Sequence, residues 1–375
     1  MKLTRSLAIT ALGLGTALAA TATTATVANA KACGKAGELT VVSWGGAYTK
    51  SQVEAYHKPF MKDCAGSKIK SQDYNGGIAE IKAQVEGKKV SWDIVDVELS
   101  DAIRACDEGL LETIDHSKLP KGDNGAVATD DFLKGTLYEC AVANIVWSTI
   151  FAYDTTKIKG DTPKTMADFF DLKKWPGKRG LRKGAKVNLE FALMADGVAA
   201  KDVYKILETK AGIDRAFKKL DTIKGSVVWW TAGAQPPQLL ADGEVLMTTA
   251  YNGRIFNAVA GEGKPFAIVW DGQIWDLDLW VIPKGAPNKD LAMDFLKYST
   301  GTKALAAQAS YISYGPARQS SSPLVGKYHN KDIDMGPQMP TAPNNLKNAV
   351  QSNFSFWADN ADQLKERFNA WLAKG

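Results

Sequence analysis

Three short runs of β-branched and aromatic residues follow one another in the first third of the chain. They cover residues 38–44, 68–74 and 93–97, and each is followed by a turn and a segment with helical spacing of apolar positions. Successive strand–helix units of this kind predict a parallel sheet with right-handed crossovers. The residues just after the strands, 44–48, 75–77 and 98–100, are therefore expected to meet on one edge of the sheet.

The middle and the end of the chain predict a second group of strands and helices. The apolar run 141–153 has little polar alternation, which is typical of a strand buried on both faces or crossing between two lobes. Helical spacing covers 189–199 and 203–220, and 266–283 predicts two strands around an Asp271-Gly272 turn. Closing helices are expected within 344–374.

The stretch 227–254 (VVWWTAGAQPPQLLADGEVLMTTAYNGR) predicts a strand, a short helix, a second strand and the start of another helix. Its aromatic and polar residues fall at or just beyond the strand ends, where open α/β sheets bind ligands: Trp229, Trp230, Gln235, Tyr251 and Arg254. A buried aromatic pair, a helix cap and a surface arginine would explain these residues singly. The group as a whole favours a ligand pocket.

The amino-terminal segment 1–30 is predicted to be a signal peptide. A basic start, an apolar run over 7–20 and the sequence Ala-Asn-Ala ending at Ala30 predict cleavage after that residue. No second apolar run is long enough to span a membrane. We therefore expect a soluble protein exported to the periplasm. Lys31, two residues before Cys33, argues against lipid attachment at that cysteine.

Four cysteines lie early in the exported part: Cys33, Cys64, Cys106 and Cys140. An even number in an oxidising compartment predicts two disulfides. Cys33 and Cys64 each precede one of the first two strands, and parallel neighbours would start side by side. We therefore expect the pairs Cys33–Cys64 and Cys106–Cys140. With no CxxC spacing and only 3 histidines, neither redox catalysis nor a metal site is expected.

The charge pattern and the motifs narrow the function class. Lysine and arginine number 46 against 41 acidic residues, and they are scattered, so we expect no nucleic-acid or membrane partner. The densest basic stretch, 173–186, is most simply a solvated loop. No phosphate loop, nucleophile elbow or HExxH motif is present, so we expect neither a cofactor nor catalysis. Glu98 and Asp278 could share an edge, as carboxylates do in glycosidases and in cation-binding pockets.

Five segments occur along the chain in a specific order and spacing: VVSWGGAY, WDIVDVELSD, QLLADGEVLMTTAYNGRI, DLDLWVIPKGAPN and YISYGPAR. With them, the chain after residue 30 resembles the periplasmic solute-binding proteins of ABC importers, most closely the spermidine/putrescine-binding branch. The resemblance implies a two-lobed, type II-like α/β fold, in which each lobe is a mainly parallel sheet flanked by helices and the ligand is held between the lobes. We assign residues 31–145 and 265–312 to lobe 1, and 146–264 and 313–375 to lobe 2. A monomer that delivers its ligand to membrane permease subunits is expected.

The resemblance also implies which residues line the pocket. Trp44 and Tyr48 match an aromatic pair after the first strand, and Tyr251 matches a later pocket aromatic. Asp278 matches the acid that pairs with an ammonium group, and Tyr314 matches a late tyrosine. The full set of expected ligand-binding residues is Trp44, Tyr48, Glu98, Trp229, Gln235, Tyr251, Arg254, Trp275, Asp278 and Tyr314. Glu98 falls where polyamine binders often carry a serine, and Glu190 lies near their interlobe acid.

Arg254 is the main departure from the polyamine-binding pattern, because it stands where those proteins place a second aspartate. A diamine needs an acid at each end, whereas the fork of an arginine suits a carboxylate or a phosphate. We therefore expect a ligand with an ammonium against Asp278 and Glu98, stacked on an aromatic ring such as Trp44, Trp275 or Tyr251. Its carboxylate would bind Arg254. An internal salt bridge of Arg254 to one of those acids, which would leave a pocket for a cation, is the alternative.

The predicted function is the receptor of an ABC importer for a small amine-containing solute, either polyamine-like or an amino-acid-like zwitterion. Two alternatives remain. One is an exported hydrolase that uses Glu98 and Asp278. The other is a binding protein for another solute such as ferric iron, which would draw on Tyr311 and Tyr314, although these tyrosines are not adjacent.

Overall fold

A computed structural model describes residues 36–374, so the predicted signal peptide, its cleavage site and Cys33 lie outside the described residues. The strands are β1 (Glu38–Ser43), β2 (Lys68–Asp73), β3 (Ile94–Glu98), β4 (Leu137–Tyr138), β5 (Ala141–Asp154), β6 (Arg179–Arg182), β7 (Val227–Trp230), β8 (Met247–Tyr251), β9 (Phe266–Val281), β10 (Gly315–Pro316) and β11 (Val350–Gln351). The α-helices are α1 (Gly46–Gln52), α2 (Lys58–Asp63), α3 (Ala79–Glu86), α4 (Leu99–Asp107), α5 (Ala128–Asp131), α6 (Met166–Phe170), α7 (Asn188–Ala195), α8 (Val203–Leu207), α9 (Lys210–Asp221), α10 (Gln235–Ala241), α11 (Asn252–Phe256), α12 (Lys289–Ser299), α13 (Thr302–Ala309) and α14 (Phe354–Ala373).

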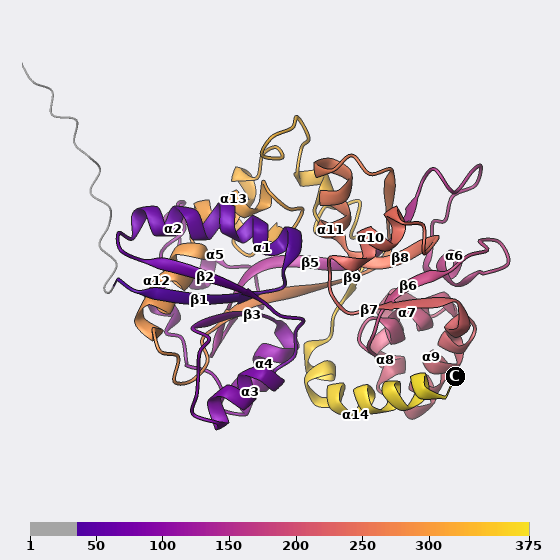
Figure 1. The fold of residues 1–375 in the computed structure, drawn as a ribbon, viewed down its shortest axis with the longest axis horizontal. Coiled ribbons are helices and arrows are strands. Elements are labelled where there is room, and N and C mark those ends of the chain that lie inside the picture. The colour runs from indigo at the N-terminus through magenta and orange to yellow at the C-terminus, as the bar shows by residue number, and fades with distance from the viewer. Residues whose placement is uncertain (1–35, 375) are drawn as a thin grey trace, which may run out of the picture.

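One mixed sheet runs through the molecule in the order β2-β1-β3-β9-β5-β8-β6-β7, with helices packed around it (Figure 1). At one end, β1 pairs in parallel with both β2 and β3, which confirms the predicted strand–helix units. At the other end, β6 pairs in parallel with both β7 and β8. The sheet is thus two parallel groups joined through antiparallel strands, which confirms the expected α/β fold.

The long strands β5 and β9 cross the middle of the molecule side by side and join its two halves (Figure 1). Every residue of β5 is buried, as its continuous apolar run predicts. The segment predicted as two strands around Asp271-Gly272 is instead the single strand β9. Both of its ends pair antiparallel with β5, so the chain keeps its direction there. Where the turn was predicted, the pairing of β9 with β5 is irregular. The register shifts there between Thr149 and Phe151 of β5, opposite Gly272, whose φ is 70°.

The apolar side chains form two large cores, one in each half. The first includes Val41 and Ile94 from the parallel strands of the amino-terminal half and extends to Leu277 in β9. The second includes Leu181 from the other half and extends to Ile274 in β9. The change of core on this strand falls between Ile274 and Leu277, because the first part of β9 packs with the second half. The lobe boundaries stay predictions.

The structure also bears on the predicted disulfide, on the helix expected over 203–220 and on membrane-spanning helices. The Cys106–Cys140 disulfide is present, with a Cα–Cα distance of 5.8 Å. The helix expected over 203–220 is divided into α8 and α9, because Thr209 caps a new helix by accepting a hydrogen bond from the backbone N–H of Gly212. Within residues 36–374, no helix is long and apolar enough to cross a membrane.

Candidate functional site

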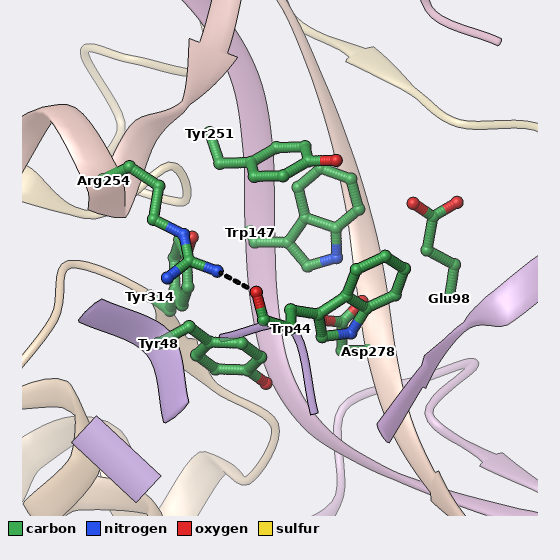
Figure 2. A pocket seen from close by; sticks show the side chains of 8 residues that line it. All are labelled: Trp44, Tyr48, Glu98, Trp147, Tyr251, Arg254, Asp278 and Tyr314. Atoms are coloured by element: carbon green, nitrogen blue, oxygen red, sulfur yellow. Dashed lines mark hydrogen bonds between the residues drawn. The ribbon is translucent and has the colours of Figure 1, made fainter. Parts of the chain in front are cut away.

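A small cavity lies where the two halves meet, lined by eight side chains (Figure 2). They come from the edge predicted to bind ligand and from the crossing strands: Trp44, Tyr48, Glu98, Trp147, Tyr251, Arg254, Asp278 and Tyr314. Seven of the ten residues expected from the sequence are therefore brought together. The side chains leave about 240 Å³ between them, part of it open to solvent.

Aromatic rings form most of the cavity wall. Tyr251 meets Trp147 edge to face at a centroid distance of 5.1 Å, and Tyr48 meets Tyr314 in the same way at 5.2 Å. Trp44 is half-buried at the end of β1 and packs on a further tyrosine at 5.0 Å. The faces of such rings attract cations. Trp147, in the middle of β5, is the pocket aromatic that the sequence reasoning missed.

Two glycines leave room for the rings of Tyr251 and Tyr314, which pack closely against them. A Cβ on Gly233 would lie 2.9 Å from the ring of Tyr251, and a Cβ on Gly253 would lie 2.6 Å from the ring of Tyr314. Carbon atoms at contact are roughly 3.5–4.0 Å apart, so a side chain at either position would displace a cavity wall. Both glycines thus help to shape the cavity, a role that only the tertiary structure reveals.

Asp278 presents an unmatched carboxylate to the cavity. It lies in β9, paired in register with Glu98 of β3, and is 4% exposed. Its Oδ1 atom has no hydrogen-bond partner, and no ion pair joins it to a basic side chain within residues 36–374. Burial, together with the negative charges of Asp96, Glu98 and Asp276, raises the pKa of Asp278 well above its usual range. An ammonium group in the cavity would relieve this unfavourable burial of charge.

Arg254 presents an unmatched positive charge on the other side of the cavity (Figure 2). It is 3% exposed and donates from Nη1 to the carbonyl of Gly45 at 2.5 Å and from Nη2 to the carbonyl of Trp44 at 3.2 Å. Its Nε has no partner, and within the described chain it forms no ion pair. The alternative of an internal salt bridge to Asp278 or Glu98 is therefore not what the structure contains.

Glu98, in contrast, is neutralised from the opposite half of the molecule. Its Oε1 accepts from Nη1 of Arg182 at 3.1 Å and its Oε2 accepts from Nζ of Lys186 at 2.7 Å. Burial raises the pKa of Glu98, but these two cations outweigh it and hold the pKa at about 2. Arg182 and Lys186 belong to the basic stretch 173–186, so the interpretation of that stretch as a solvated loop was wrong for these two residues.

A third buried acid, Asp96, holds the cavity residue Tyr48 by a hydrogen bond. Asp96 accepts hydrogen bonds at Oδ2 from Tyr48 Oη at 2.9 Å, Gln52 Nε2 at 2.5 Å and Asn144 Nδ2 at 2.8 Å. Burial raises the pKa of Asp96 to about 7, against the effect of these hydrogen bonds. The network holds the Tyr48 ring in place, and it adds negative charge near Asp278.

Three expected residues lie away from the cavity. Trp229 points to the other face of β7, where its ring meets Phe368 of α14 edge to face at 5.4 Å. Gln235 is exposed, and its side chain accepts from the backbone N–H of Thr231 at 2.7 Å, which closes the turn before α10. Trp275 packs against the first core. It alternates with its acidic neighbours along β9 and therefore faces away from Asp278.

Glu190, expected near the interlobe acid, is fully buried in α7. Its Oε1 accepts from Tyr204 Oη at 2.8 Å and from Trp357 Nε1 at 2.7 Å. These partners belong to the second half of the molecule, so Glu190 stabilises the packing of α14 on α7 and does not line the cavity.

Comparison with known proteins agrees with this arrangement. The family of bacterial extracellular solute-binding proteins matches residues 55–341. The gamma-aminobutyric acid-binding protein of Pseudomonas aeruginosa is 45% identical over 336 residues, which are 90% of this chain and 91% of that protein. Spermidine/putrescine-binding periplasmic protein 1 of Haemophilus influenzae is 23% identical over 282 residues, which are 74% of this chain and 73% of that protein.

Solved structures show the same fold. PBP MotA from A. tumefaciens B6 in complex with glucopine superposes with a TM-score of 0.81 at 30% identity, covering 90% of this chain and 100% of that one. A GABA receptor superposes with a TM-score of 0.75 at 32% identity, covering 90% and 98%. By its family match over most of its length and its 45% identity to a relative, this chain belongs to the bacterial extracellular solute-binding proteins.

Proposed function

We propose that this protein is the receptor of an ABC importer for γ-aminobutyrate or a closely similar linear amino acid with separated amine and acid groups. One observation carries the proposal. Among the residues that the structure describes, one aromatic cavity holds a buried carboxylate without a cation, Asp278, and a buried guanidinium without an acid, Arg254. A zwitterion would match both charges at once. The 45% identity to a gamma-aminobutyric acid-binding protein supports this choice of solute.

The ammonium of the ligand would bind Asp278 and stack on the rings of Trp44, Trp147 and Tyr251. Buried charges are stabilised only when they are paired, so this contact favours an amine over a neutral group. The ligand carboxylate would bind Arg254. A guanidinium has five N–H donors. Within the described residues, Arg254 uses two of them in hydrogen bonds to backbone carbonyls, so the Nε–H and the other donors remain for the ligand.

Binding would also bring the two halves of the molecule together. Arg254 belongs to α11, and the carbonyls that it holds belong to the turn after β1 in the other half. A ligand between Asp278 and Arg254 would add a further bridge between the halves. The closed form would then be recognised by the permease. The periplasmic location, cleavage after Ala30 and monomeric state are parts of this proposal, and membership of an extracellular solute-binding family supports it.

The structure also bears on the two alternatives. Glycosidase chemistry pairs a general acid of raised pKa with an ionised carboxylate, and Asp278 and Glu98 could take these two parts. Both oxygens of Glu98, however, already accept hydrogen bonds from Arg182 and Lys186, which favours a structural role for that carboxylate. Tyr311, which a ferric site would need beside Tyr314, instead stacks on His329 at 4.6 Å and lines a different hollow. Incubation of the protein with chromogenic glycosides should release no chromophore.

Isothermal titration calorimetry on protein that has been unfolded and refolded to remove bound solute tests the proposal. We expect micromolar binding of γ-aminobutyrate, equivalent to about −8 kcal/mol. Truncating one partner of a buried charge pair costs roughly 2–5 kcal/mol, so Asp278→Asn should weaken binding at least about 30-fold. Asp271→Asn is the matched control. It makes the same change in the same strand, at an aspartate that accepts an exposed hydrogen bond from Asn348. Wild-type protein that ignores γ-aminobutyrate would refute the proposal.

A second pair of variants separates ligand binding by Arg254 from its role in holding the turn after β1. Arg254→Gln should abolish the preference for γ-aminobutyrate over butylamine, which lacks the carboxylate. Arg215→Gln, on an exposed ion pair to Asp196, is the control. If Arg254 served only to hold the turn, its loss would weaken both ligands by the same factor.

A further inference from the structure

A second hollow adjoins the ligand cavity and shares three of its walls, Glu98, Trp147 and Tyr251. About 290 Å³ lies between its walls, part of it open to solvent, and the side chains of Arg182 and Lys186 line it from the second half of the molecule. A ligand that extended beyond Asp278 would enter this hollow. The two cations therefore stand where the far end of a longer solute would lie.

The ammonium of Lys186 is bound there in the manner of a ligand. Its Nζ donates to Glu98 Oε2 at 2.7 Å, to Asp276 Oδ2 at 2.9 Å and to Ser100 Oγ at 3.1 Å. A lysine ammonium has three donors, so each can be matched by one of these acceptors. Burial lowers the pKa of Lys186, but Asp276 and Glu98 outweigh it and keep the pKa well above its usual range, so the group is charged.

The backbone around Lys186 is held in an unusual conformation. Val187, the next residue, has φ 73° and ψ −41°, which a β-branched residue rarely adopts. Strain of this kind persists only where the surroundings enforce it, and it is found at ligand-contacting segments. Asn188 enforces it here, because its Nδ2 donates to the carbonyls of Arg182 at 2.7 Å and Gly184 at 2.8 Å. The loop is thus locked with the lysine directed at the two acids.

The charges at this junction show what the lysine changes. Lys186 pairs with both Glu98 and Asp276, and Arg182 pairs with Glu98 as well. Within the described residues, Asp278 forms no ion pair. Without Lys186, Asp276 would also lose its cation, and two unpaired carboxylates would stand at this junction, the complement of a diamine.

We propose that Lys186 is a specificity-determining residue: its own ammonium occupies a second amine site formed by Glu98, Asp276 and Ser100, so the receptor accepts a solute with one amine and rejects diamines. This inference rests on the proposed function, because it concerns the same cavity. It assigns the rejection of diamines to a built-in competitor as well as to the repulsion by Arg254.

Calorimetric titration of wild type, Lys186→Met and Lys183→Met with γ-aminobutyrate and with putrescine tests the inference. Lys183 is an exposed lysine in the same loop, so its variant is the matched control. The ratio of the putrescine Kd to the γ-aminobutyrate Kd should fall at least about tenfold in Lys186→Met and stay unchanged in Lys183→Met. A zwitterion has no net charge, so its affinity should change less than that of the diamine.

Two further variants complete the test. The double variant Lys186→Met/Asp276→Asn removes the carboxylate that loses its cation in Lys186→Met, and it should return the Kd ratio toward that of wild type. Lys186→Gln, which can still donate to the acids, replaces Lys186→Met if the latter does not fold. An unchanged ratio in the folded Lys186 variant would overturn the inference, as would equal weakening of both ligands, the sign of a purely structural tie between the halves. The proposed function fails separately, if wild type does not bind γ-aminobutyrate.

Discussion

Gly233→Ala tests whether the Tyr251 ring forms a wall of the binding cavity. Gly233 precedes α10, and its φ does not lie in the left-handed region, so alanine fits the backbone. The only conflict is steric. The new Cβ would lie 2.9 Å from Cδ2 and Cε2 of Tyr251 and 3.3 Å from Nε of Arg254. Restoring normal contact of roughly 3.5–4.0 Å requires the ring to move by about 0.5–1 Å.

The direction of that movement sets the result. Trp147 and Trp230 meet the Tyr251 ring edge to face at 5.1 Å and 5.5 Å, so the open direction is the cavity itself. In the free protein the ring can relax into that space at little cost. In the complex the ligand occupies it, and the overpacking cost of roughly 1–3 kcal/mol appears in the binding free energy. Since about 1.4 kcal/mol corresponds to tenfold, affinity should fall by about 5- to 150-fold.

The assay is calorimetric titration with γ-aminobutyrate, accompanied by a thermal melt of the free protein. We expect the melting temperature to change little while the Kd rises. Gly225→Ala is the control, because a Cβ there would meet no atom within 4 Å. Wild-type affinity in Gly233→Ala would refute the assignment of Tyr251 to the binding site. A large loss of melting temperature with unchanged affinity would show that the ring matters only for packing.

Three other predictions concern pH, the disulfide and a buried ion pair. Affinity for γ-aminobutyrate should rise as the pH increases above the usual pKa of an aspartate, about 4, by up to about tenfold per unit, because burial raises the pKa of Asp278 and an ammonium binds its ionised form. The ligand-free protein should lose stability over the same rise, since the folded state holds the proton more tightly than the unfolded state; a flat affinity profile would count against Asp278. Replacing Cys106 and Cys140 by serine should lower the free energy of unfolding by roughly 3–4 kcal/mol, given the 34-residue separation, as measured by urea denaturation; no change in the denaturation midpoint would contradict this. Asp131→Ala should cost roughly 3–5 kcal/mol because it strands the fully buried guanidinium of Arg318, whereas adding Arg318→Met should recover part of that loss; an additive double variant would be the contrary result.

Local patterns predicted those parts of the fold and the site that depend on sequence neighbours. The strand–helix units place Trp44 and Tyr48 beside the cavity, because both residues lie shortly after the end of β1. Asp278 and Arg254 were expected at the site, and the cavity contains both. Their roles in binding remain predictions. The Cys106–Cys140 bridge, predicted from strand order and the pairing of four cysteines, is confirmed.

The missed features depend on residues far apart in the chain. Lys186 looked like part of a solvated basic loop, because its acidic partners Glu98 and Asp276 lie 88 and 90 positions away. Trp147 stands in a strand whose every residue is buried, so nothing in its local pattern distinguishes a cavity wall from a core residue. Trp229 was expected at the site but lies away from it. The sequence of its short strand does not show which face packs against α14, and Trp229 is on that face.

A crystal structure of the protein with γ-aminobutyrate would show directly whether one cavity pairs the ammonium of the solute with Asp278 and its carboxylate with Arg254. We expect the ligand amine within hydrogen-bond distance of an Asp278 carboxylate oxygen and the ligand acid on the remaining donors of Arg254. A ligand in the reverse orientation, with its acid on Arg182 and Lys186, or a ligand outside the cavity, would contradict it.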